Sequence, residues 1–133
     1  MKDQKSLLKV VEAVAPTSGK VTTTAIAIDR QGYESLTITS VLGACAFTGA
    51  AYITPTLTES DNGTDYTAVA ANKYIGDLTP VKATLAANKV STIGYIGDKR
   101  YVKFSFVVTG TLPTDVDLVA LGILGHPHLA PVA

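Results

Sequence analysis

Hydrophobic and polar residues alternate along much of the chain, beginning near residue 21. In "SLTITSVL", Leu36, Ile38 and Leu42 alternate with threonines, which is the period of a β-strand with one buried face. The stretch "RYVKFSFVV" has the same period. The face of this stretch that we expect in the core consists of Val102, Phe104, Phe106 and Val108.

Turn-forming residues separate these strand-like stretches. Asn62-Gly63 lies between "AYITPTLTES" and "DYTAVAA" and is typical of a type I′ hairpin turn, in which both central residues need positive φ. The "GDK" in "TIGYIGDKRYVKFSFVVTG" predicts a second hairpin. Pro55 cannot donate a ladder hydrogen bond, so its strand is expected at a sheet edge or at a bulge. The final strand, "VDLVALGIL", has Val119, Leu121 and Ile123 on one side.

About seven or eight short strands at a spacing of roughly ten residues predict an all-β fold, an antiparallel β-sandwich that is jelly-roll-like. The sandwich is expected over residues 21–124, between an N-terminal arm (1–20) and an extended C-terminal tail (125–133). The arm sequence "SLLKVVEAV" fits a helical turn or a strand, and residues 71–92 fit a short helix or a long connection. Apolar residues of the arm and tail fall outside the sandwich pattern. We therefore expect partner contacts through Leu7, Leu8, Val10, Val11, His126, His128 and Leu129.

Composition narrows the class of protein. The chain has 133 residues, the size of one domain, with 47% hydrophobic and 17% charged residues. Such low charge suits a protein that packs against others. Lys+Arg and Asp+Glu are balanced at 11 each, which gives no support to nucleic-acid binding through phosphates. We find no membrane-spanning run and no export signal, and a single cysteine excludes an intrachain disulfide.

The acidic "SDNGTD" is the first candidate for chemistry. Asp61, Asn62 and Asp65 offer oxygen ligands to a cation, but the spacing is not that of a calcium loop and no closing glutamate follows. The Asn-Gly pair favours a turn, with a weak cation site as the alternative.

Three other features are weighed as sites. His126 and His128 are two apart on an extended segment, but no third metal ligand is evident, and a polar tail is the favoured interpretation. Cys45 lies among small residues without a nearby His or Asp, which favours a buried thiol over a nucleophile. Asp98, Lys99 and Arg100 form a charge cluster that fits a solvated hairpin tip or an anion or carboxylate contact. No catalytic or nucleotide-binding motif is present, so we expect no enzymatic activity, no cofactor, no metal and no small-molecule substrate.

The tracts "DNGTDYTAV", "YIGDKRYVKFSFVVTGT" and "VALGILGHPHLAPV" resemble those of the small jelly-roll proteins that decorate the heads of tailed bacteriophages. In that family a hairpin of the form "SxDGxxFT" precedes a core strand of the form "RYVRLxxxVxGT". The resemblance covers roughly residue 29 to the C-terminus. The matching residues are Ser60, Asp61, Gly63, Tyr66, Thr67, Arg100, Tyr101, Val102, Phe104, Gly110 and Thr111.

This resemblance implies a capsid decoration, or cement, protein located in the virion. It implies binding to the lattice of the major capsid protein, as a homotrimer, with no nucleic-acid or membrane partner. The same "SDNGTDYT" and "RYVKF" pattern is similar to that of β-sandwich carbohydrate-binding modules. A carbohydrate- or host-receptor-binding module is therefore the alternative, although the chain has no tryptophan to stack on sugars.

Overall fold

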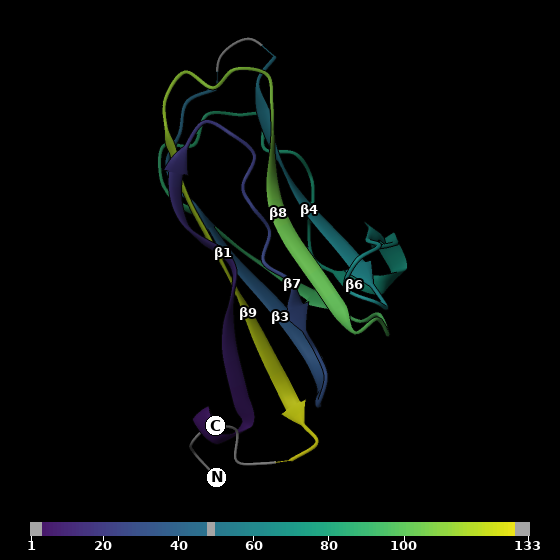
Figure 1. Ribbon diagram of the computed structural model, residues 1–133. Coiled ribbons are helices and arrows are strands. Elements are labelled where there is room, and N and C mark those ends of the chain that lie inside the picture. The colour runs from purple at the N-terminus through teal and green to yellow at the C-terminus, as the bar shows by residue number, and fades with distance from the viewer. Residues whose placement is uncertain (1–3, 48–49, 130–133) are drawn as a thin grey trace.

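The computed structural model describes residues 4–47 and 50–129, and it confirms an all-β fold of two packed antiparallel sheets (Figure 1). The five-stranded sheet has the order β1-β9-β3-β7-β6, and the four-stranded sheet has the order β2-β8-β4-β5. The strands are β1 (Leu8–Gly19), β2 (Ile28–Asp29), β3 (Tyr33–Leu42), β4 (Tyr52–Ser60), β5 (Thr67–Ala68), β6 (Tyr74–Ile75), β7 (Lys89–Tyr95), β8 (Tyr101–Thr109) and β9 (Val116–Pro127). Two short 3₁₀ helices are η1 (Lys5–Leu7) and η2 (Ala71–Lys73).

The order of pairing is that of a jelly roll. Strand β1 pairs with β9, β2 with β8, β3 with β7 and β4 with β5, so the chain pairs as a series of nested, long-range hairpins. The β3–β9 and β4–β8 pairs then join these hairpins into the two sheets. The short β6 is an addition beside β7. This topology confirms the fold class expected from the spacing of strands and turns.

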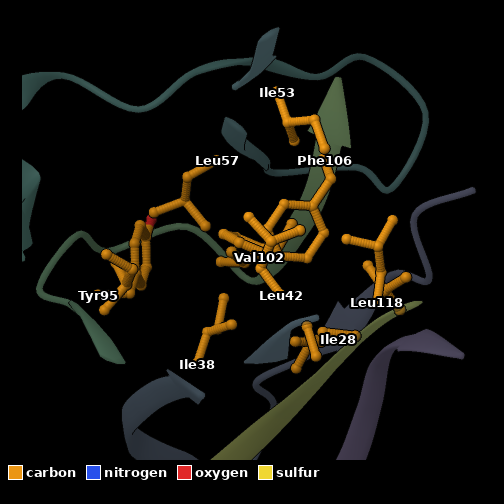
Figure 2. Close-up of a cluster of buried hydrophobic side chains, with 14 of the residues drawn as sticks. Ile28, Ile38, Leu42, Ile53, Leu57, Tyr95, Val102, Phe106 and Leu118 are labelled. Carbon is orange, nitrogen blue, oxygen red and sulfur yellow. The ribbon is translucent and has the colours of Figure 1, made fainter. Parts of the chain in front are cut away.

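The core lies between the sheets and is built from the alternating faces read in the sequence. Val102, Phe104 and Phe106 of β8 are 0%, 1% and 3% exposed. The rings of Phe104 and Phe106 meet edge to face with centroids 5.1 Å apart, a favourable aromatic geometry. In Figure 2, Ile38 and Leu42 of the five-stranded sheet point into the same cluster as Val102 and Phe106.

Strand β9 has apolar side chains on both of its faces. Leu118, Ala120 and Leu124 are buried in the core. Val119, Leu121 and Ile123 therefore occupy the outward side, where Leu121 is 39% exposed. The five-stranded sheet thus has apolar residues on both faces at this strand.

The hairpin predicted at "GDK" does not form. Strand β7 pairs with β3 and β6, and β8 pairs with β2 and β4, so residues 96–100 carry the chain from one sheet to the other. A hairpin and an inter-sheet crossing both join two strands with alternating apolar faces. The local pattern is therefore the same for both. Only the arrangement of the whole core decides between them.

The N-terminal segment differs from the expected arm, because β1 is the edge strand of the five-stranded sheet and pairs with β9 from Leu8 to Gly19. The register shifts between Glu12 and Val14 and again between Val14 and Thr17. Each bulge reverses the alternation of side chains, so the strand has no steady period in the sequence. Strand β9 likewise continues to Pro127, into the expected tail, and residues 130–133 of that tail lie outside the described part of the chain.

The "SDNGTD" stretch is a turn, although not of type I′. Gly63 has a φ of 76°, but Asn62 is not among the described residues with positive φ. Instead the Asn62 side-chain oxygen accepts hydrogen bonds from the backbone N–H groups of Thr64 (2.8 Å) and Asp65 (2.9 Å). The Asn62 side chain thus takes the place of a backbone acceptor within the loop. This loop, which joins Ser60 of β4 to Thr67 of β5, is longer than a two-residue turn.

Two other expectations can be compared with the structure. Pro55 faces Phe106 of β8, whose backbone N–H and C=O both bond to Thr23, so the pair needs no donor from proline. On its other side β4 pairs with β5 at Thr58 and Glu59 and with Val81 through Ile53. Pro55 lies between these two contacts, so the strand tolerates the missing donor without being a free edge. Residues 71–92 contain both the helical turn η2 and a long connection.

Candidate interaction surface

Three of the residues expected to contact partners, Leu7, Leu8 and His126, lie at one end of the sandwich. This is the end where β1 begins and β9 ends (Figure 1). Leu8 pairs with Gly125 across the two strands. A groove of about 420 Å³ lies there. We call it the terminal groove, and it is lined by Gln4, Leu7, Leu8, Ser35, Gly125, His126 and Pro127. The segments that flank the sandwich in the sequence therefore form one surface.

The other predicted contact residues differ in exposure. Val10 points outward and is 58% exposed, and Leu129 is 87% exposed. Val11 instead is partly buried and packs against the core. Ordinary alternation causes the difference between Val10 and Val11, because adjacent residues of a strand face opposite sides and the register of β1 is regular from Leu8 to Glu12.

The two histidines do not converge on a common ligand. His126 has a φ of 51°, and its Nδ1 lies 2.9 Å from Ser35 Oγ. His128 Nε2 lies 3.6 Å from a carboxylate oxygen of Glu34. Residue 126 is in the left-handed region although β9 continues to Pro127, so the strand is locally distorted at this histidine. Within the described residues no group of three His, Cys, Asp or Glu side chains is placed to hold a metal ion.

A polar network ties the two sheets together. Tyr95 of β7 is 3% exposed, and its hydroxyl donates to Glu59 of β4 at 2.5 Å. The same hydroxyl accepts from the backbone N–H of Lys99 at 3.1 Å. Arg30 lies over the Tyr95 ring, 4.8 Å from its centroid, and donates to the Lys99 carbonyl. Burial and the Glu59 hydrogen bond both raise the pKa of Tyr95, so the hydroxyl remains a donor.

The charge cluster at residues 98–100 is largely paired with carboxylates. Lys99 Nζ lies 2.6 Å from Asp61, and Arg100 makes two hydrogen bonds of 2.9 Å to Asp29. The interpretation as an anion site is thus weakened, because the cations already face carboxylates. The sequence did not indicate that Arg30 and Glu59 belong to the polar network. Their partners, Lys99 and Tyr95, are distant along the chain, so the neighbouring residues carry no motif for these contacts.

The Asp29–Arg100 pair makes stability depend on acidity. The hydrogen bonds from Arg100 lower the pKa of Asp29 below its ordinary value of 3.8. The ionised form is therefore favoured in the folded state. Its contribution is complete above the unfolded-state pKa and is lost as the pH falls through the lowered folded-state pKa.

We expect the thermal midpoint to fall on acidification below about pH 4, and Asp29→Asn to flatten that dependence. Thermal unfolding followed by circular dichroism between neutral and acidic pH measures both. Glu34→Gln, in the weaker pair with His128, is the control and should keep the slope of the wild-type chain. Equal slopes for wild type and Asp29→Asn would contradict the role of this pair.

Two further observations concern classes of function. Cys45 is 6% exposed, and burial raises the pKa of its thiol, which disfavours the reactive thiolate. No helix in the described part of the chain is long and apolar enough to cross a membrane.

Comparison with known proteins identifies likenesses of fold. No family model and no curated protein sequence matches the chain. Among solved structures, the SPBc2 prophage-derived protein YomS is similar with a TM-score of 0.51 at 14% identity, over 88% of this chain and 91% of that one. A chain of infectious bursal disease virus, Gx strain, is similar with a TM-score of 0.51 at 15% identity, over 90% of this chain.

The similar structures differ in how much of their own length the chain covers. The chain spans about a third of the virus chain, 32% of its length, but nearly all of YomS. The xylanase 10B CBM22-1–GH10 structure from Clostridium thermocellum matches at a TM-score of 0.44 and 10% identity, which is too low to carry an argument. At these identities the comparisons show a β-rich fold shared with a prophage-derived protein and a virus protein.

Proposed function

We propose that this chain is a structural virion protein that decorates the head of a tailed phage and binds the lattice of its major capsid protein. The observation that carries this proposal is the terminal groove, which is lined by Leu7 and Leu8 of the N-terminal segment and by His126 of the C-terminal segment. The resemblance of the sequence to phage decoration proteins supports it, as does the fold shared with a prophage-derived protein. The function requires no catalysis, and we propose that the chain is not an enzyme.

The mechanism would be burial of surface at many equivalent sites. Each copy covers a junction between capsid subunits and adds contacts that the shell lacks without it. We propose that the chain acts as a homotrimer, so that three weak contacts form together. Linked contacts raise the overall affinity far above that of each one, which suits attachment to a repeating lattice.

The alternative, a carbohydrate- or host-receptor-binding module, would need open aromatic faces on which sugars stack. Tyr52, Tyr66 and Tyr101 lie on or beside the outer face of the four-stranded sheet. A cation lies over each of these rings, at centroid distances of 5.0 Å for Lys82, 4.2 Å for Lys103 and 4.9 Å for Arg100. A sugar would have to displace these cations, so the arrangement favours the capsid protein as partner.

Co-sedimentation tests the proposal. Empty heads are assembled from the major capsid protein of the phage that encodes this chain, mixed with the purified chain and pelleted. We expect the wild-type chain in the pellet at a fixed ratio to capsid protein. The double variant Leu7→Asp/Leu129→Asp should bind at least about tenfold more weakly, because each new carboxylate must be desolvated at an apolar contact.

The control is Val21→Asp, the same change at an exposed valine (72%) beyond the opposite end of β1. It should bind like the wild-type chain. A wild-type chain that stays in the supernatant at every concentration would overturn capsid binding. A host-glycan array, probed in parallel, would then test the alternative.

A further inference from the structure

The outward side of the five-stranded sheet carries an apolar surface that its core does not explain. Six residues from four strands share this side, and we call them the outer apolar face: Val10, Val41, Val90, Val119, Leu121 and Ile123. The register places them in cross-strand rows. Val10 is opposite Ile123, and Val119 and Val90 flank Val41 on its two sides. Val90 is 64% exposed and Val10 is 58% exposed, so large apolar groups meet solvent here.

Charge is excluded from the centre of this face. The remaining central outward positions are Thr37, Thr39 and Thr92. In β1, β3, β7 and β9 the outward charged residues are Glu12, on the edge strand, and Asp117, at the far end of β9. The outward side of the four-stranded sheet is different, because it presents Lys103 and the tyrosines with their cations. The two faces of the sandwich are therefore suited to different partners.

The face is large enough for a stable contact. Four strands about 4.8 Å apart and about ten residues long, at about 3.3 Å per residue, cover roughly 600 Å². A standard protein interface uses about 800 Å² on each partner. The face alone is therefore close to the standard size, without the terminal groove that capsid binding would use.

We infer that the outer apolar face is where copies of this chain meet one another, with the face of each copy turned toward the axis of the trimer. A surface without central charge can meet its own copy without placing like charges together. Permanent contacts between identical chains are also more apolar than transient contacts with other proteins. This inference rests on the self-association part of the proposed function and is independent of capsid binding.

Sedimentation velocity of the purified full chain tests the inference. We expect the wild-type chain to sediment as a trimer, and Leu121→Lys to sediment as a monomer, because a charged group at this position must be desolvated within an apolar contact. Val90→Lys, at a more exposed position of the same face, is the second variant and should also dissociate the trimer. Circular dichroism and thermal unfolding report whether each variant is folded.

The control is Thr56→Lys, on the outward side of the four-stranded sheet, which should remain a trimer. Folded Leu121→Lys and Val90→Lys variants that stay trimeric would overturn the assignment of the face and leave the proposed function intact. A wild-type dimer that both variants dissociate would support the face and replace the trimer.

A monomeric wild-type chain would overturn the inference, whether or not it pellets with capsids. Pelleting with capsids is the separate test of capsid binding. If such a monomer loses capsid binding in the face variants, the occupant of the face is the capsid protein.

Discussion

Replacing Phe104 by alanine is expected to lower the free energy of unfolding by about 3 to 5 kcal/mol, the usual cost of removing a buried phenyl group. Phe104 is 1% exposed in β8, which is paired on both sides, and its ring contacts Phe106 edge to face. The strand cannot move inward to fill the space without breaking its ladder with β4. A cavity therefore remains, and its cost adds to the lost burial.

Urea unfolding at one fixed protein concentration measures this effect, because association with other copies would make the midpoint depend on concentration. Phe104→Leu, which removes less volume, should fall between the alanine variant and the wild-type chain. Lys103→Ala is the matched control at the next position, which points outward over Tyr66. It should cost about 1 kcal/mol or less. Equal losses at residues 103 and 104 would contradict the assigned direction of the two faces.

Replacing Gly97 by alanine is expected to destabilise the fold by about 1 to 3 kcal/mol through overpacking. An added Cβ would lie 2.5 Å from Cζ of Tyr95. That ring cannot give way easily, because it is buried and its hydroxyl is bonded to Glu59 and to the Lys99 backbone. The substitution therefore either strains residues 96–100 or breaks the hydrogen bond between the two sheets.

A double-mutant cycle with Tyr95→Leu isolates the cause of this loss. Leucine does not reach the space beside Gly97, so the alanine should cost less in that background. Gly19→Ala is the matched control, since no atom lies within 4 Å of the added Cβ and φ is not positive there. It should be neutral or slightly stabilising. Additive losses in the cycle would show that Gly97 acts independently of Tyr95.

The fold class was readable from the sequence because it depends on local alternation. Val102, Phe104 and Phe106 face the core as their spacing predicts, and Pro55 lies opposite a residue whose backbone bonds elsewhere, so its missing donor costs no ladder bond. The topology was less accessible. The residues on either side of "GDK" have the pattern of a hairpin, yet they belong to different sheets. Nothing local distinguishes a neighbour in the same sheet from one across the core.

For the candidate surfaces, too, the sequence indicated which residues could contact a partner but not how they are arranged. The sequence indicated that Leu7, Leu8, His126 and Leu129 lie outside the strand pattern, but it did not place the two segments beside each other. Pairing of β1 with β9 does this, across more than a hundred residues of chain. The outer apolar face was also hidden. Its residues belong to four strands, and in each strand they look like ordinary members of an alternating pattern.

The "SDNGTD" stretch shows how far the sequence alone predicts a loop. Its composition established a turn, because asparagine and glycine favour chain reversal. The tertiary structure decided its form, with the Asn62 side chain bonded inside the loop and Asp61 paired with Lys99 from the crossing between sheets. By itself the sequence determined an all-β chain with a given set of strands and one turn. Which strands pair, which faces remain exposed and which charges meet depended on contacts between residues far apart, because burial of the whole core selects among locally equivalent arrangements.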